Sequence, residues 1–158
     1  MKKIVHLPEY CMACGLCTVY CSAAHAAPGI DLVKAFKKYG RPQAGIRVEK
    51  GAAEAWALSC KHCEAPDCVA SCITGAMSKD AETGVVECDI SKCVGCFTCV
   101  AACPYGMITV SGIGQEKAYA QKCDLCSGIS EVPLCVQNCP NEALLWVEAG
   151  EEGSEEVC

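Results

Sequence analysis

The stretch CVGCFTCVAACP, residues 93–104, decides the fold of this chain. Its cysteines follow the spacing C-x2-C-x2-C-x3-C with a proline after the last, a run of thiolates typical of [4Fe–4S] sites. Three cysteines spaced three residues apart can wrap one loop around a cubane, so that each thiolate reaches a different iron. The fourth cysteine stands about one helical turn beyond the third, and it can therefore reach a neighbouring cluster.

Three further cysteine motifs repeat this pattern, and all four end in the same C-x3-C spacing. Together they use sixteen of the eighteen cysteines: Cys11, Cys14, Cys17 and Cys21; Cys60, Cys63, Cys68 and Cys72; Cys93, Cys96, Cys99 and Cys103; Cys123, Cys126, Cys135 and Cys139. No motif lacks a cysteine. We therefore expect four cofactors, all of them [4Fe–4S] clusters with complete ligation, and a mixed set with one [3Fe–4S] cluster or one lost site is the milder alternative.

Two other roles for so many cysteines fit less well. Zinc sites also use C-x2-C pairs, but they need no third cysteine a few residues later and no fourth after x3. A disulfide scaffold belongs to secreted chains, and the segment from Met1 to Pro8 contains neither an apolar signal core nor a twin arginine. We expect a cytoplasmic protein with reduced thiols and no membrane span.

The composition predicts a thin apolar core. Leu, Ile, Val and Phe together make up about a fifth of the 158 residues, near the level at which a chain needs help to fold. Bound metal can supply that free energy. The formal net charge of −6 argues against a nucleic-acid partner. Residues 31–50 are locally basic, which suits either a solvated loop or a docking site for an acidic partner.

Short elements are expected around the motifs, which gives an α+β fold class. Four segments are predicted as strands: Lys3–Leu7, Val85–Cys88, Met107–Val110 and Ala143–Val147. Residues 79–84 are typical of a hairpin turn, residues 99–102 of one or two helical turns, and residues 23–39 of a partial helix that ends before the break at 40–45.

With these motifs, the chain resembles the four-cluster ferredoxin-like electron-transfer subunits of dimethyl sulfoxide reductase, formate dehydrogenase, formate-linked hydrogenase, carbon monoxide dehydrogenase and tungsten aldehyde oxidoreductase. The resemblance covers about residues 3–147. It implies two nested bacterial-ferredoxin-like modules, an outer one over 1–30 and 111–148 and an inner one over 60–110. A linker at 31–59 and an acidic tail at 149–158 complete the expected division. Ser22 and Ile73 stand where simple ferredoxins commonly have proline.

The resemblance also implies how the motifs share ligands. One cluster would be bound by Cys11, Cys14, Cys17 and Cys139, and its partner by Cys123, Cys126, Cys135 and Cys21. The inner pair would be bound by Cys60, Cys63, Cys68 and Cys103, and by Cys93, Cys96, Cys99 and Cys72. Spacing alone leaves the pairing open, since twenty residues separate Cys72 from Cys93 and nineteen separate Cys103 from Cys123. Pairing of the strands at 3–7 and 143–147 would bring the first and fourth motifs together.

The expected function is electron transfer. The resemblance implies a subunit between a catalytic metal-cofactor subunit (a tungsten or molybdenum aldehyde or formate oxidoreductase, or carbon monoxide dehydrogenase) and a FAD- or NAD-binding flavin subunit or a soluble ferredoxin. The sequence has no Gly-rich phosphate loop and no nucleophile–base set, so we expect no enzyme activity of the chain alone. The alternatives are a free-standing diffusible polyferredoxin and a self-assembling cluster chain.

A few residues outside the ligand set have weaker expectations. His62, between two motif cysteines, could tune a cluster potential, but a surface imidazole beside the cluster is favoured. His25 has no ligand-like context. Cys88 is expected to be a small buried residue on a strand, and Cys158 a free thiol.

Overall fold

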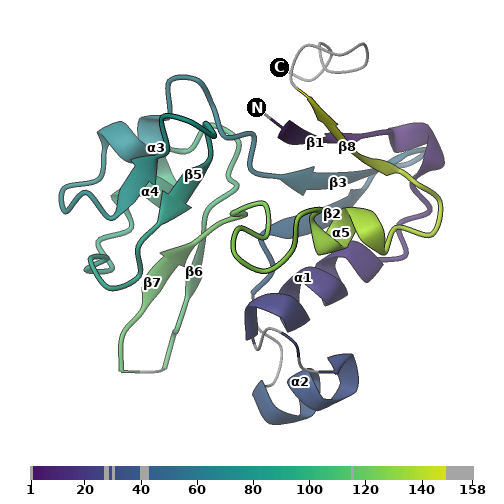
Figure 1. Ribbon diagram of the computed structural model, residues 1–158, viewed down its shortest axis with the longest axis horizontal. Helices are drawn as coiled ribbons and strands as arrows, with labels where there is room; N and C mark the ends of the chain where they lie inside the picture. Colours follow the sequence, from purple (N-terminus) through teal and green to yellow (C-terminus); the bar gives the residue numbers. More distant parts are fainter. Residues whose placement is uncertain (1, 27–28, 30, 40–42, 115, 149–158) are drawn as a thin grey trace.

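The computed structural model describes residues 2–26, 29, 31–39, 43–114 and 116–148 (Figure 1). The acidic tail at 149–158 and Cys158 lie outside these residues. Strand β1 (Lys2–His6) pairs antiparallel with β8 (Leu144–Glu148), with Lys2 opposite Glu148 and His6 opposite Leu144. This confirms the expected strand pairing, which places the start of the first motif beside the end of the fourth.

The lobe around this sheet carries the first and fourth motifs. After the short 3-10 helix η1 (Pro8–Tyr10), helix α1 (Leu16–Ala26) packs against α5 (Leu134–Gln137) and against α2 (Leu32–Tyr39). The helix expected over 23–39 is therefore two helices, and the first begins within the first motif. Because α1 starts there, Cys17 and Cys21 occupy successive turns of one helix face.

The segment expected to be a linker contains a second hairpin. Strands β2 (Ile46–Lys50) and β3 (Ala55–Ser59) pair antiparallel, with Ile46 opposite Ser59 and Lys50 opposite Ala55. Ile46, Ala55 and Ala57 are buried, so one face of the hairpin covers the first lobe. The alternation of apolar and polar residues over 46–50 is a local signal for a strand.

The other lobe carries the second and third motifs (Figure 1). Helices α3 (Asp67–Ala70) and α4 (Thr98–Ala102) pack together, and two hairpins flank them: β4 (Met77–Lys79) with β5 (Val86–Cys88), and β6 (Thr109–Ser111) with β7 (Tyr119–Gln121). The predicted turn at 79–84 is confirmed. Asp80 holds it, because its N–H donates to Val85 and its carboxylate accepts from the N–H groups of Glu82 and Thr83.

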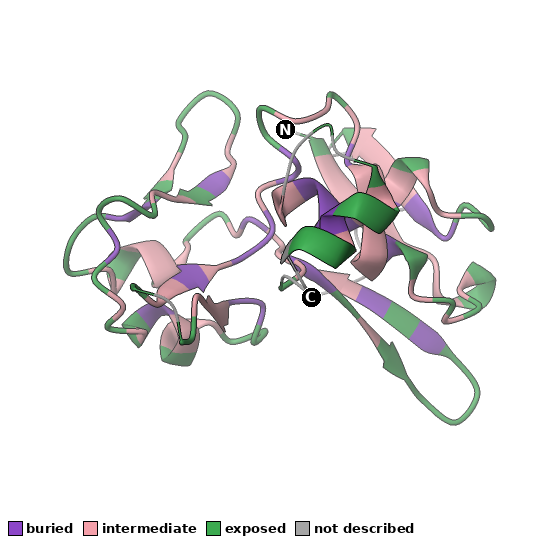
Figure 2. Ribbon diagram, turned by 90° about the horizontal axis from the view of Figure 1, so that it is seen from below, coloured by how far each residue is buried: buried purple, intermediate pink, exposed green. Residues whose placement is uncertain are grey.

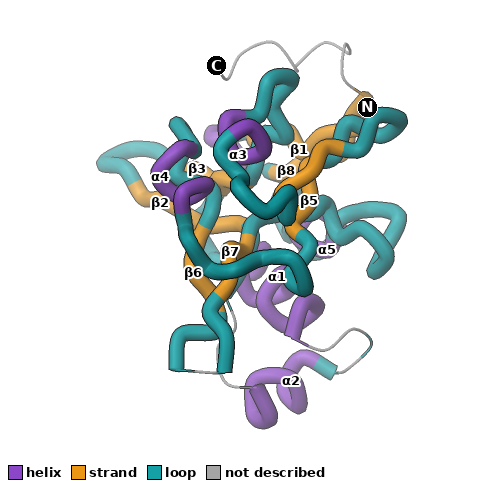
Figure 3. Tube along the Cα trace, turned by 90° about the vertical axis from the view of Figure 1, so that its left-hand side faces the viewer, coloured by secondary structure: helices purple, strands orange, loops and turns teal. Residues whose placement is uncertain are grey.

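Each lobe has a small core in which cysteines take the place of large aliphatic side chains. In the first lobe, Ile46, Ala57 and Leu144 pack with Cys17, Cys21 and Cys135. In the second, Ala76, Met77, Ile108 and Ala120 pack with Cys93 and Cys99. Buried stretches are accordingly short and interrupted by exposed ones (Figure 2), and loops make up much of the trace (Figure 3). None of the helices in the described ranges is long and apolar enough to span a bilayer.

Candidate iron–sulfur sites

The same backbone geometry recurs in all four C-x2-C loops. The residue before the second cysteine has a left-handed conformation each time, with φ of 56° at Ala13, 48° at His62, 71° at Gly95 and 60° at Leu125. Three of these residues are not glycine, and a positive φ is uncommon for such residues. The same loop conformation therefore occurs four times, in agreement with the sequence repeat.

The first group of cysteines lines a cavity between the loop before α1 and the loop after α5. Three members come from the first motif and one from the fourth: Cys11, Cys14, Cys17 and Cys139. Ala57 and Leu144 close the cavity from the β2–β3 hairpin and the β1–β8 sheet.

The second and third groups line two cavities in the other lobe. The second group is Cys60, Cys63, Cys68 and Cys103. The third group is Cys72, Cys93, Cys96 and Cys99. Each group takes three cysteines from one motif and one from the other. The exchange follows from the packing of α3 against α4, which sets the ends of the two motifs side by side.

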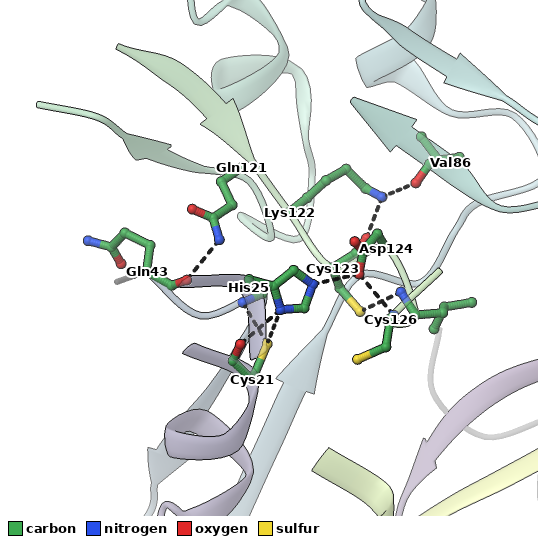
Figure 4. A network of polar contacts seen from close by, with 11 residues as sticks. Cys21, His25, Gln43, Val86, Gln121, Lys122, Cys123, Asp124 and Cys126 are labelled. Atoms are coloured by element: carbon green, nitrogen blue, oxygen red, sulfur yellow. Dashed lines mark hydrogen bonds and ion pairs between the residues drawn. The ribbon is translucent and has the colours of Figure 1, made fainter. Parts of the chain in front are cut away.

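The fourth group is the most deeply buried and contains Cys21, Cys123, Cys126 and Cys135. Burial raises the pKa of Cys135, and the neighbouring thiols of Cys123, Cys21 and Cys126 raise it further. Cys21, Cys123 and Cys126 lie around the ring of His25 (Figure 4). The structure thus gathers the sixteen motif cysteines into the four sets that the resemblance implied. Metal ligation by those sets stays a prediction.

Backbone N–H groups point at several of these sulfur atoms. Gly45 donates to Cys21 Sγ at 3.2 Å, Met77 to Cys72 at 3.3 Å and Met107 to Cys103 at 3.4 Å. Each of these three acceptors is the last cysteine of its own motif. Each joins a group whose other three cysteines come from a different motif. N–H donors of this kind stabilise bound thiolates and tune cluster potentials. The second, third and fourth groups each combine four thiols with such a donor, which fits a [4Fe–4S] cluster.

Gly45 is a position where a single methyl group should remove one site. A Cβ at Gly45 would lie 2.7 Å from Cys123 Cα and 2.8 Å from Cys123 N, which are backbone atoms that cannot rotate away. We expect Gly45→Ala to displace Cys123 and weaken the donor to Cys21. With one [4Fe–4S] cluster in each group, as the sequence predicts, iron should then fall from about sixteen to about twelve atoms per chain. Iron analysis with electron paramagnetic resonance (EPR) spectra of the three remaining sites checks this. Full iron content with an unchanged spectrum would contradict it.

His62 is buried, which corrects the expectation of a surface imidazole. Its exposed fraction is 3%, and its Nδ1 accepts the Val86 N–H at 2.9 Å. Burial, together with the nearby charge of Lys122, lowers the pKa of His62 to about 3. The ring is therefore neutral at physiological pH, with its proton on Nε2, and Nε2 has no hydrogen-bond partner among the described residues.

His25 is a site residue that the sequence analysis missed. Its Nδ1 donates to the Cys21 carbonyl at 2.8 Å, and its Nε2 donates to Asp124 Oδ1 at 2.9 Å. The hydrogen bond to Asp124 is the main reason that the pKa of His25 rises to about 11. The ring is an imidazolium beside the fourth group. The available signal was helical spacing, since His25 follows Cys21 by four residues on α1.

Cys88 is half-buried on β5 and lines the cavity of the third group. Burial, and after it the thiols of Cys93 and Cys99, raise the pKa of Cys88 to about 12. Cys88 was expected to be a small buried residue, and the structure places it as a fifth thiol beside four motif cysteines. Its raised pKa keeps the thiol protonated at neutral pH.

Comparison with known proteins identifies the class of this chain. A model of the 4Fe–4S dicluster domain family matches residues 53–149, which is more than half of the chain. The chain belongs to this family of iron–sulfur proteins.

Particular relatives carry names that refer to electron transfer. The chain is 34% identical over 151 residues to the "Thiosulfate reductase electron transfer subunit PhsB" of Salmonella typhi, covering 89% of this chain and 72% of that protein. It is 36% identical over 150 residues to the "Electron transport protein HydN" of Escherichia coli (strain K12), covering 87% and 83%. It also matches AegA of the same organism at 36% over 143 residues, 88% of this chain but 21% of AegA.

Proposed function

We propose that this chain is an iron–sulfur electron-transfer subunit of an oxidoreductase complex, with one [4Fe–4S] cluster bound by each of the four cysteine groups. Such clusters supply one-electron redox chemistry. The first and fourth groups belong to an outer ferredoxin-like module, and the second and third to an inner module nested within it. The exchange of one cysteine between paired motifs in each lobe supports this division.

The four groups form a row in the order first, fourth, second, third. Helices α1 and α5 tie the first group to the fourth, and α3 with α4 ties the second to the third. The fourth and second groups adjoin between the lobes, since the Lys122 ammonium donates to the carbonyl of Cys123 in the fourth group and to that of Val86, which lines the cavity of the second. Electron relays need sites that follow one another at short range, and this order of groups would provide them.

Exposure of the two ends of the row is the observation that carries the proposal. Among the described cysteines, Cys14 and Cys96 are the exposed ones, and they belong to the first and third groups. Large apolar side chains are exposed beside them: Met12 near Cys14, and Val94 near Cys96. A relay that serves two partners needs an accessible site at each end, and exposed apolar residues are what a docking partner covers.

The partners proposed for the two ends differ in chemistry. One is a large catalytic subunit with a tungsten, molybdenum or nickel–iron cofactor, and the other is a flavin subunit or a soluble ferredoxin. The chain itself is proposed to have no catalytic activity. The similarity to PhsB, which is named as an electron transfer subunit of thiosulfate reductase, supports a subunit over a free-standing polyferredoxin. The size of the native particle separates the two forms.

We expect removal of this chain from the native complex to abolish electron delivery to the physiological acceptor. The catalytic subunit should keep turnover with a small artificial dye, because the dye reaches the catalytic cofactor without a relay. The measurement is reduction of the acceptor and of the dye by complex prepared with and without this chain. Adding back iron-loaded chain should restore delivery, and adding back iron-free chain should not. Delivery that continues unchanged without the chain would refute the relay.

A further inference from the structure

Lys122 is a buried lysine at the junction of the two lobes. It follows β7 directly and precedes Cys123, the first cysteine of the fourth motif. Its exposed fraction is only 6%, whereas lysine side chains are almost never buried without a charged partner. Within the described residues, however, no carboxylate forms an ion pair with Lys122.

The ammonium of Lys122 instead bridges the two lobes through backbone carbonyls. It donates to the Val86 carbonyl and, at 2.6 Å, to the carbonyl of Cys123 (Figure 4). Val86 is fully buried on β5 and lines the cavity of the second group, while Cys123 belongs to the fourth group. Lys122 therefore stands between two groups that come from different modules.

The two carbonyl contacts place the ammonium beside both groups, since Val86 lines the cavity of the second group and Cys123 belongs to the fourth. A buried charge is screened much less by salt than an exposed one. As ligands of the proposed clusters, the cysteines of these two groups would be thiolates and would supply the counter-charge that Lys122 lacks among the described carboxylates.

We propose that the buried positive charge of Lys122 raises the reduction potentials of the clusters bound at the second and fourth groups. Reduction adds negative charge to a site, and a fixed cation nearby stabilises the reduced form. The two inner positions of the row would then be easier to reduce than they would be without Lys122. This inference rests on the proposed binding of four clusters.

The test uses the iron-loaded full chain with three substitutions at this position. Lys122→Gln removes the charge but keeps hydrogen-bond donors, Lys122→Met removes both, and Lys122→Arg keeps both. Redox titration followed by EPR gives the potentials of all sites in each variant. We expect two of the four potentials to shift in the negative direction in the Gln and Met variants, and to stay near the wild-type values in the Arg variant.

Lys117 provides a matched control. Its ammonium also donates to two backbone carbonyls, those of Ile90 and Ser91, but its side chain is exposed. Lys117→Met should leave all four potentials near their wild-type values, because solvent screens the charge that it removes. A shift in Lys117→Met as large as that in Lys122→Met would overturn the proposal, as would equal shifts of all four potentials in Lys122→Gln.

Iron and sulfide analysis of each variant separates this inference from the relay itself. Loss of iron in the Gln and Met variants that is restored in Lys122→Arg also supports a charge requirement at the junction, and loss in all three variants overturns it. Four clusters with unchanged potentials in Lys122→Gln and Lys122→Met would overturn the role of Lys122 and leave the relay standing. Fewer than four clusters in the wild-type chain would overturn the proposed binding itself.

Discussion

Stripping the iron from this chain is expected to unfold it. The reason is the composition of the two cores, in which buried apolar positions are filled largely by cysteine and alanine, and the largest fully buried side chains are Val86 and Pro133. Fully burying a valine or leucine side chain contributes about 1.5–3 kcal/mol, whereas ordering one residue costs about 1–2 kcal/mol of backbone entropy. Alanine and cysteine side chains offset that cost poorly.

We expect bound clusters to supply the missing free energy. For comparison, structural zinc contributes about 10 kcal/mol or more to the folding of zinc-finger peptides, which matches the whole stability of a typical domain. The cysteine groups also join segments that are far apart in the sequence, as Cys139 joins Cys11. Without the metal, these cross-links between the motifs are lost together with the filling of the cavities.

Circular dichroism and calorimetry on anaerobic protein, before and after chelation of iron, measure this effect. We expect the far-ultraviolet signal of the short helices to collapse and the cooperative melting transition to disappear. Oxidative destruction of the clusters is a second route to iron-free protein and should give the same result. The control is protein that is exposed to the chelator too briefly to lose its iron. Iron-free protein that melts cooperatively near the holoprotein temperature would contradict the expectation.

The sequence was most informative where chemistry depends on local spacing. The C-x2-C loops predicted three cysteines of each group, because a thiolate loop is built from residues that lie close together in the sequence. The fourth cysteine of each group was implied by the family resemblance, since spacing alone left the pairing of the motifs open. The hairpin turn at 79–84 and the strands β1 and β8 were predictable for the same reason, since turn residues and short β-branched runs act locally. The hairpin β2–β3 was missed although its alternating pattern was present, because weak local signals between glycine and alanine residues resemble those of a loop.

Long-range burial could not be predicted from the sequence. His62 and Lys122 are polar residues beside cysteines in the sequence, and both positions are compatible with a solvated surface. They become buried because strand β5 covers them, through Val86, which binds His62 with its N–H and Lys122 with its carbonyl. His25 is similar, since its partner Asp124 lies 99 residues away along the chain. Such contacts depend on how segments far apart in the chain pack together and not on the motifs themselves.

Exchange of cysteines between motifs gives the sharpest test of the proposed sites. Cys135 lies on α5 and Cys139 follows that helix, so only three residues separate two cysteines of the same motif. Cys139 nevertheless lines the cavity of the first group, whereas Cys135 is surrounded by the thiols of the fourth. Substitution of the two should therefore damage different clusters. A serine oxygen is a harder and weaker ligand for iron–sulfur sites than a thiolate.

We expect Cys139→Ser to lower the iron content of the chain. The loss should be about one iron atom if a three-iron cluster forms, and about four if the whole cluster is lost. Its EPR spectrum should match that of Cys14→Ser, which removes a ligand of the same group, and should differ from that of Cys135→Ser. Cys135→Ser should in turn match Cys21→Ser, although these two cysteines come from opposite ends of the chain. Cys88→Ser, outside the motifs, should keep the full iron content. If Cys139→Ser and Cys135→Ser instead remove the same signal, each motif binds its own cluster and the row of shared sites is wrong.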